Sequence, residues 1–325
     1  MKILVTGGTG FIGSYLAESL IKSGHEVHCL VRKRSNLQWL SSLPVKLVYG
    51  EMLDKESLAG AVKDKDIIYN LAGVIKAKNK AGYETGNFIA AKNLIESVHQ
   101  HNKTLKRFLH VSSLAAAGPC LNGICHSENV APCPISDYGK TKLMGEEEVK
   151  KYARLMPVTI IRPPVVYGPR DTGLLPFFKA LAFGIRPVFN KSKSISIIYM
   201  DDLVEGIIKA SLETKSISNT YFITNDEPVT FNRLSDIVAG ILGKKTMPIY
   251  IPDWLVKVAA TISEGLSLMT PDATTFNRQK AHEMSQDLWG CLNQNAKSDF
   301  GFTPKMQLVE GLKKTVAWYK EMKWI

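Results

Sequence analysis

The sequence has few cysteines and no apolar stretch long enough to cross a membrane. Five cysteines in 325 residues exclude a small disulfide-stapled secreted scaffold, so we expect a reduced, cytoplasmic protein. The most apolar late segment, residues 254–269, carries Lys257 and Glu264 and predicts an amphipathic helix, not a membrane span. The first apolar run begins at Ile3 and has only a strand's length, so no signal peptide is expected.

Metal-binding side chains are sparse as well. Cys120, Cys125, His126 and Cys133 lie close together in the sequence, but their spacing matches no zinc-binding pattern. They fall in a run rich in turn-forming residues. We therefore expect a loop there and no metal site.

Acidic residues are outnumbered, 30 against 41 lysines and arginines, which gives a net charge of +11 and a pI of about 9.3. The basic residues are spread along the chain and form no basic helix interleaved with aromatics, so nucleic-acid binding is not expected. An anionic cofactor or substrate would use part of this charge. The cluster Lys76, Lys78 and Lys80 has two interpretations, a solvated loop or a receiver for an anionic substrate.

Short apolar runs alternate with amphipathic stretches in the first half of the chain. Strands are predicted at residues 2–7, 26–32, 45–50, 66–73, 107–113 and 158–164, and helices at 11–24, 55–63, 87–100 and 138–155. The strands are rich in Val, Ile and Leu without alternation, as in strands buried on both faces. This pattern predicts an α/β fold with a doubly wound parallel sheet, whose ligands bind at the carboxyl ends of the strands.

The segment GGTGFIG, residues 7–13, joins the first strand to the first helix. Gly7 would permit a tight turn, Gly10 would let the backbone approach a pyrophosphate at the helix N-terminus, and Gly13 would let the helix pack closely. A flexible turn is the alternative. The strand before and the helix after are, however, the context that a dinucleotide-binding turn requires.

The regular alternation of strand and helix patterns ends at about residue 170. Helical patterns at 201–213, 231–243, 253–266 and 308–320 are separated by prolines and by short strand candidates at 194–200 and 220–225. We predict a dinucleotide-binding domain over residues 1–170, with 196–224 returning to it. A smaller, mostly helical substrate-binding region is predicted over residues 171–195 and 225–325.

The spacing of TGGTGFIG resembles the extended short-chain dehydrogenases/reductases, the NAD-dependent epimerase/dehydratase group. Other motifs of that group follow in order: NLAG at 70–73, Asn87, HVSS at 110–113, YGKTK at 138–142, IRPPVVYGPRD at 161–171 and IYMDDLVEGI at 198–207. The resemblance covers nearly the whole chain, more weakly after about residue 225. It implies an enzyme that uses a nicotinamide dinucleotide.

Tyr138 and Lys142 are four residues apart on a predicted helix and therefore share a face. A nearby ammonium favours the phenolate, so Lys142 would lower the pKa of Tyr138 from its ordinary value of about 10. Tyr138 would then exchange a proton with a substrate oxygen, while Lys142 also holds the nicotinamide ribose. Two solvated residues on an ordinary helix are the alternative.

The resemblance assigns three more polar residues. Counting back from Gly118 places the catalytic serine at Ser113, whose hydroxyl would bond the substrate oxygen. Ser112 would face the cofactor or the backbone. Asn87 stands where the family has a helix-opening asparagine with a structural and relay role.

Cofactor choice is indicated after the second strand, where Arg32, Lys33 and Arg34 occur without a carboxylate. Guanidinium groups suit a 2′-phosphate, so NADP(H) is favoured and NAD(H) is possible. The family's Gly-Asp pair near the adenine is Gly50-Glu51 here. The expected cofactor contacts are Gly7, Thr9, Gly10, Phe11, Ile12, Gly13, Arg32, Arg34, Glu51, Met52, Leu71, Ala72, Gly73, Asn87, Ser112, Tyr138, Lys142, Pro163 and Val165.

The sequence departs from the nucleotide-sugar members of the family. These hold the substrate diphosphate with an arginine and an asparagine, at positions occupied here by Ile195 and Gly173. The likeness is closer to the dihydroflavonol-reductase and 3β-hydroxysteroid-dehydrogenase branches, which act on apolar substrates. We therefore expect an NADP(H)-dependent oxidoreductase that interconverts a carbonyl and a hydroxyl on a small apolar molecule.

Two other functions stay open: a nucleotide-sugar epimerase or dehydratase that uses the same site, and an NADP-sensing protein without turnover. The late apolar residues Trp254, Leu255, Phe276 and Trp289 either line an apolar pocket or belong to the core. Relatives commonly pair the helices that begin near Asn87 and Tyr138. Apolar residues on more than one face of 87–98 fit such a contact, so we expect a homodimer.

Overall fold

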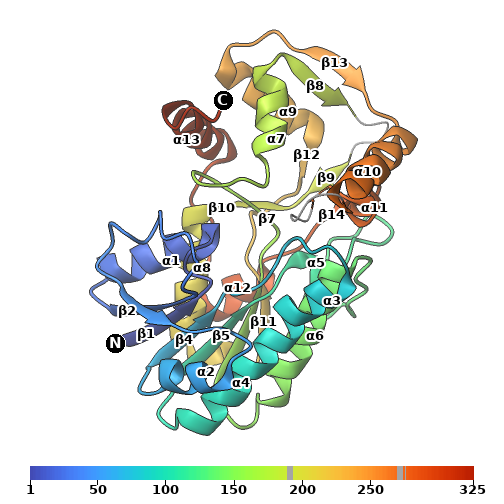
Figure 1. The fold of residues 1–325 in the computed structure, drawn as a ribbon. Coiled ribbons are helices and arrows are strands. Elements are labelled where there is room, and N and C mark those ends of the chain that lie inside the picture. Colours follow the sequence, from blue (N-terminus) through green and yellow to red (C-terminus); the bar gives the residue numbers. More distant parts are fainter. Residues whose placement is uncertain (189–192, 269–273, 275) are drawn as a thin grey trace.

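The computed structural model describes residues 1–188, 193–268, 274 and 276–325 (Figure 1). Its main sheet has seven parallel strands in the order β11-β6-β5-β4-β1-β2-β3. They are β1 (Lys2–Thr6), β2 (Glu26–Val31), β3 (Lys46–Tyr49), β4 (Ile67–Asn70), β5 (Arg107–Val111), β6 (Val158–Arg162) and β11 (Thr220–Phe222). The strand order reverses between β1 and β4, and ligands of such sheets bind at that crevice. The predicted doubly wound sheet is confirmed.

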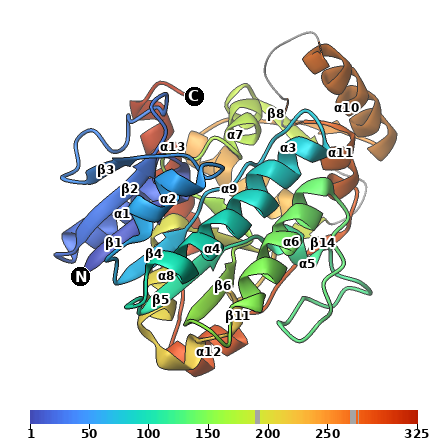
Figure 2. The same ribbon diagram turned by 60° about the horizontal axis from the view of Figure 1, so that its bottom comes forward.

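Helices cover both faces of this sheet. One face carries α1 (Phe11–Lys22), α8 (Met200–Leu212) and α12 (Gln294–Phe300), and the other carries α2 (Lys55–Val62), α4 (Ala90–His101) and α6 (Asp137–Lys151), side by side in Figure 2. Successive residues of β1 point to opposite faces, so Ile3 and Val5 join one core cluster and Leu4 the other. All three are fully buried, which contributes about 1.5–3 kcal/mol each.

The remaining elements lie beyond the carboxyl ends of the sheet strands, in the upper part of Figure 1. The helices are α7 (Leu175–Ala182), α9 (Phe231–Leu242), α10 (Asp253–Leu268), α11 (Arg278–Met284) and α13 (Leu308–Glu321). Short strand groups accompany them: β7 (Val165–Tyr167) with β10 (Ile197–Tyr199), β8 (Ile185–Val188) with β13 (Met247–Tyr250), and β9 (Ser194–Ile195) between β12 (Val229–Thr230) and β14 (Leu288–Trp289). The predicted strand at 194–200 is thus two strands.

Four short helical turns complete the chain: α3 (Lys80–Tyr83), the π-helical η1 (Glu84–Ile89), α5 (Leu114–Ala117) and η2 (Thr214–Ser216). The late part is mostly helical, as expected. Its final segment also returns to the sheet, because Ala296 and Phe302 pack in the core on the α1 and α8 side. Within the described ranges, no helix combines the length and the apolar character that a membrane crossing requires.

Candidate active site

The glycine turn after β1 has the geometry that the sequence predicted. Gly7 has a φ of +70°, and a β-carbon there would lie 2.7 Å from the carbonyl carbon of Leu71. A β-carbon on Gly13 would lie 2.2 Å from the Gly7 oxygen, so only glycine allows the helix this close. Helix α1 begins at Gly10 with no side-chain cap. Its first N–H groups therefore suit an anion such as a pyrophosphate.

Most of the expected cofactor residues follow the carboxyl ends of successive sheet strands. Those at the strand ends are Gly7 and residues 9–13 after β1, Arg32 and Arg34 after β2, Glu51 and Met52 after β3, Leu71 to Gly73 after β4, Ser112 after β5, and Pro163 and Val165 after β6, whereas Asn87, Tyr138 and Lys142 lie on helices. Arg32 and Arg34 are exposed in a turn that the bond from the Arg32 N–H to Ser35 Oγ closes at 3.0 Å. Buried Ser112 Oγ has no hydrogen-bond partner among the described residues. An open helix terminus, a cradle of glycines and an unpartnered hydroxyl together fit a nicotinamide dinucleotide.

The three expected catalytic residues lie together at the end of β5. Ser136 begins α6 by accepting a hydrogen bond from the Gly139 N–H at 3.1 Å, which puts Tyr138 in the first turn. Ser113 caps α5 through the Ala115 N–H at 3.1 Å and is hydrogen-bonded to the Tyr138 phenol. One turn along α6, Lys142 Nζ donates to the Val111 carbonyl oxygen at 2.8 Å.

The electrostatics differ from the expectation in one respect. Burial raises the pKa of Tyr138 to about 12, although the Ser113 hydrogen bond acts in the opposite direction. Burial also lowers the pKa of Lys142 to about 8, and the Glu146 carboxylate partly opposes that change. The predicted lowering of the Tyr138 pKa by Lys142 is not seen, because removal of the phenolate from water is the largest effect and the nearby Glu283 carboxylate and Tyr83 phenol raise the pKa further. At neutral pH the phenol holds its proton and can donate it.

Asn87 has a structural role, inside a helical stretch and not at its start. It lies in the π-helical turn η1, is buried, and bonds both backbone groups of Val74, at 2.8 Å through Oδ1 and 3.1 Å through Nδ2. Its amide also donates to Thr141 Oγ1 of α6 at 3.2 Å. A β-carbon on Gly73 would lie 2.9 Å from Asn87 Oδ1 and 3.7 Å from Lys142 Nζ. Asn87 thus ties the segment after β4 to the catalytic helix.

Sequence reasoning missed the ion pair behind Lys142. Glu146 Oε1 and Oε2 accept hydrogen bonds from Arg162 Nε at 2.9 Å and Nη2 at 2.6 Å, and both side chains are buried. A sequence feature could have revealed Glu146, since Tyr138, Lys142 and Glu146 are spaced four residues apart and therefore lie on one face of α6.

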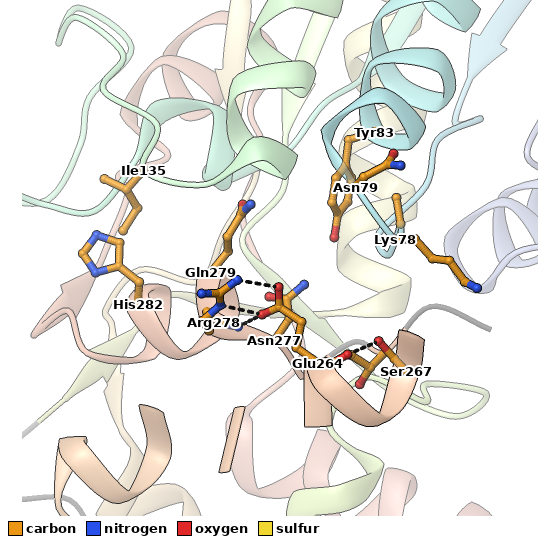
Figure 3. A pocket seen from close by; sticks show the side chains of 12 residues that line it. Lys78, Asn79, Tyr83, Ile135, Glu264, Ser267, Asn277, Arg278, Gln279 and His282 are labelled. Carbon is orange, nitrogen blue, oxygen red and sulfur yellow. Dashed lines mark hydrogen bonds and ion pairs between the residues drawn. The ribbon is translucent and has the colours of Figure 1, made fainter. Parts of the chain in front are cut away.

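Figure 3 shows a pocket of about 370 Å³ whose lining residues do not include Tyr138 but do include Tyr83, which packs against Tyr138. Tyr83 and Lys78 line one side of it, and the Tyr83 ring centre lies 6.3 Å from that of Tyr138. Across the pocket, Glu264 of α10 accepts hydrogen bonds from Arg278 of α11 at 3.0–3.2 Å. The other lining residues are Ala77, Asn79, Ile135, Ser267, Thr274, Asn277, Gln279 and His282. Of the lysine cluster 76–80, Lys78 therefore lies at a pocket.

Tyr83 and Gln279 had no local sequence signal. Gln279 joins α11 to the start of α6, since its Oε1 accepts from the Asp137 N–H and its Nε2 donates to Asp137 Oδ2, both at 2.6 Å. The chain brings these residues together from positions 142 residues apart. The contact holds the far wall of the pocket beside Tyr138.

The late apolar residues do not line this pocket. Trp254 and Leu255 are exposed on α10, whereas Phe276 packs against the small core between α10 and α11. Trp289 is partly buried and donates its indole N–H to the Glu283 carbonyl oxygen at 2.9 Å. None of these four residues lines this pocket, whose walls come from residues 77–79, Tyr83, Ile135, Thr274 and Asn277 and from α10 and α11.

The two positions at which nucleotide-sugar enzymes hold the diphosphate have no polar side chain here. Ile195 is buried in the core cluster around Tyr167 and Phe178. The Gly173 N–H donates to Asp171 Oδ1 at 2.7 Å, within the turn that starts α7.

The cysteine-rich loop behaves as a loop. The Cys120 and Cys125 thiols are hydrogen-bonded to each other, and the His126 ring contacts the Pro119 oxygen at 3.0 Å. In the part of the chain that the structure describes, no group of three or more His, Cys, Asp or Glu side chains is arranged to hold a metal ion.

Comparison with known proteins agrees with this geometry. A model of the NAD dependent epimerase/dehydratase family matches residues 3–223. Ceramide reductase of Caulobacter vibrioides is 27% identical over 325 residues, which span 99% of this chain and 96% of that protein. A 2-alkyl-3-oxoalkanoate reductase of Shewanella oneidensis is 25% identical over 333 residues, 96% of this chain and 85% of that protein.

Solved structures share the fold. UDP-glucose 4-epimerase of Thermotoga maritima, solved with UDP-glucose, has a TM-score of 0.81 and 24% identity, over 99% of this chain and 100% of that one. At that identity the likeness concerns the fold alone. The family match over two thirds of the sequence nevertheless shows that the chain belongs to the NAD dependent epimerase/dehydratase family and is an enzyme of the extended short-chain dehydrogenase/reductase type.

Proposed function

We propose that the protein is an NADP(H)-dependent oxidoreductase that interconverts a carbonyl and a hydroxyl group on an amphiphilic, largely apolar substrate. The observation that carries this proposal is the joining of Ser113, Tyr138 and Lys142 at the end of β5. Proton donor, orienting hydroxyl and ammonium meet there beside a pocket. These are the groups that general acid–base catalysis at one substrate oxygen requires.

When bound, the nicotinamide would exchange the hydride at the carbon that bears this oxygen. Tyr138, protonated at neutral pH because its pKa is about 12, donates the proton to the oxygen during reduction. Ser113 orients the oxygen and stabilises the phenolate that remains. Lys142, charged below its pKa of about 8, stabilises the same phenolate and holds the ribose hydroxyls.

The cofactor would be held by the glycine turn, the residues at the strand ends and the exposed Arg32 and Arg34, which suit a 2′-phosphate. In this proposal residues 1–170 and 196–224 form the cofactor half, and 171–195 and 225–325 the substrate half. All five cysteines are free, which fits a reducing, cytoplasmic compartment.

The substrate class is supported by the names of two relatives, a ceramide reductase and a 2-alkyl-3-oxoalkanoate reductase, whose named compounds have apolar chains and polar groups. The pocket mixes polar and apolar groups, with Lys78 at one wall. Ile195, which is buried, and Gly173, which is exposed, offer no clamp for a nucleotide-sugar diphosphate. These features favour a reductase over an epimerase.

Thermal-shift titration tests this choice. NADP⁺ should stabilise the protein, by about 2.7 kcal/mol at 100 times its dissociation constant. UDP and dTDP added to the NADP⁺-saturated protein should then give no further rise. A clear rise with either would mean that a diphosphate site exists and that the epimerase alternative is right.

We further propose a homodimer built from the paired outer faces of α4 and α6. The two helices pack side by side, and Ile89 at the start of α4 is 38% exposed. Sedimentation velocity at micromolar concentration should give twice the chain mass of 36.0 kDa, and a single monomer boundary would contradict the dimer.

A further inference from the structure

Helix α10 presents an apolar face that nothing in the described chain covers. Figure 2 shows the helix standing out at the edge of the molecule. Its exposed apolar side chains form what we name the α10 apolar face: Trp254, Leu255, Val258, Ile262 and Leu266. Trp254 is 64% exposed, Ile262 59% and Leu266 61%. Contiguous apolar surface of this kind marks an interaction site.

The helix is apolar on two separate sides. At about 100° per residue, the five residues of the α10 apolar face fall within an arc of about 120°. Val256 and Ala260 lie on another side and pack against Ala281 of α11. The burial against α11 therefore already fixes the helix to the protein. An ordinary surface helix would be polar on the remaining side.

The charges around this face suit an anionic surface. Both acidic side chains of α10 are paired with cations of the chain, Asp253 with Lys193 at 2.8 Å and Glu264 with Arg278 at 3.0 Å. Lys257 is exposed beside the apolar face. Exposed Lys244 and Lys245 precede β13, which leads directly into α10, and the whole chain carries +11.

A second copy of the chain is a poor occupant because the face is too small. Full burial of five such side chains, at up to about 3 kcal/mol each and about 25 cal/mol per Å², corresponds to roughly 600 Å² at most. Stable protein interfaces bury about 800 Å² per partner. A bilayer has no such requirement, since apolar side chains of an amphipathic helix enter the headgroup boundary one by one, with tryptophan at its preferred depth.

The same helix also forms a wall of the substrate pocket. Glu264 and Ser267 of α10 line it, opposite Tyr83 (Figure 3). A surface bound through the outer side of α10 would thus lie next to that pocket.

We propose that the α10 apolar face docks the enzyme onto an anionic lipid bilayer, from which an amphiphilic substrate enters the pocket. Docking stands on the exposed face and its charges alone. Delivery of the substrate rests on the proposed function. The two parts are therefore tested separately.

Docking is tested by co-sedimentation of the full chain with vesicles of equal parts phosphatidylcholine and phosphatidylglycerol, without cofactor or substrate. The test variant combines Trp254→Ser, Val258→Ser and Ile262→Ser. The matched control combines Leu155→Ser, Leu212→Ser and Val309→Ser, three exposed apolar residues elsewhere in the chain. We expect the test variant to lose roughly tenfold or more in vesicle partitioning and the control to keep it.

Absence of vesicle binding by the unmodified chain, or equal binding by the test variant, would overturn docking. A test variant that changes the sedimentation mass and not vesicle binding would do the same and identify a self-association surface. For delivery, the test variant should lose activity on a long-chain 3-oxo ester held in vesicles and keep it on a short, water-soluble 3-oxo ester. Equal loss on both, or on neither, would overturn delivery.

Discussion

Arg162 holds Glu146 through two hydrogen bonds, of 2.9 and 2.6 Å, in the interior of the protein and one helical turn beyond Lys142. The carboxylate thus has two tasks. It neutralises a buried guanidinium, and it raises the pKa of Lys142 against the effect of burial. The pKa of Lys142 therefore depends on a buried ion pair one helical turn away.

Glu146→Gln should destabilise the protein and alter Lys142. Removing one partner of a buried ion pair leaves the other charge uncompensated, which costs about 3–5 kcal/mol in urea unfolding. The alkaline limit of activity should also move to lower pH, because a charge that favours the ammonium is gone. The exposed neighbour gives a control: Glu147→Gln should change neither quantity, and equal effects of both variants would contradict the assigned role.

Tyr138→Phe should remove the proton donor while leaving cofactor binding in place. Loss of a general acid slows the reaction by about 10²- to 10⁴-fold. The measurements are the turnover rate with NADPH and the thermal shift with NADP⁺. Normal biological activity of the variant in cells would instead favour an NADP-sensing role without turnover.

Reduction should depend on pH through Lys142. Its pKa is about 8, so kcat/KM for reduction should be flat below that value and fall as pH rises through it. Tyr138, with a pKa of about 12, stays protonated over this range. Lys142→Arg keeps its charge and should lose the alkaline limb while retaining some rate. If kcat/KM of Lys142→Arg still fell at the same pH, the fall would be due to the titration of a group other than Lys142.

The same shift has a consequence for stability. Between about pH 8 and 10.5 the unfolded chain binds the Lys142 proton more tightly than the folded one, so this lysine makes stability rise with pH. Below pH 8 its buried charge costs roughly 3 kcal/mol. Lys142→Met should therefore raise the free energy of unfolding above that of the unmodified chain. The gain should be largest near neutral pH and should shrink toward pH 10.5. A difference that does not vary with pH in urea titrations would contradict the shifted pKa.

Replacing Arg32 and Arg34 by alanine should weaken the binding of NADP⁺ more than the binding of NAD⁺. A charge-assisted hydrogen bond contributes about 1.5–3 kcal/mol, so the NADP⁺ dissociation constant should rise by roughly 10- to 100-fold. Arg154→Ala, exposed near the far end of α6, is the control and should leave both constants unchanged. Equal weakening of both cofactors in the double variant would refute recognition of a 2′-phosphate.

Much of the fold was predictable from local pattern. Unbroken apolar runs such as 3–5 predict strands buried on both faces, and Gly7 to Gly13 predict a close turn, because both requirements act within a few residues. The meeting of Ser113 with Tyr138 was predictable only through the family resemblance. Short strands such as β8 and β13 were missed, since their pairing depends on contacts between segments more than 60 residues apart.

The pocket could not be predicted in the same way. Tyr83 and Gln279 reach it through tertiary contacts without any periodic signal, and Trp254 was placed there only because it is apolar. The pKa of Tyr138 also depends on burial, which no spacing of charges reveals. The proximity of Lys142 in the sequence suggested a lowered pKa, whereas burial, which is the largest effect, raises it.

Isotope transfer tests the central claim most directly. The purified protein is incubated with NADPH that carries deuterium at both C4 positions and with a long-chain 3-oxo ester, and the product is analysed by mass spectrometry. Net reductase chemistry predicts an alcohol that carries one deuterium, with NADP⁺ formed in equal amount and both products formed about 10²- to 10⁴-fold more slowly in Tyr138→Phe. Conversion of a UDP-hexose to its 4-epimer without net change in NADP(H), and no labelled alcohol, would contradict the account.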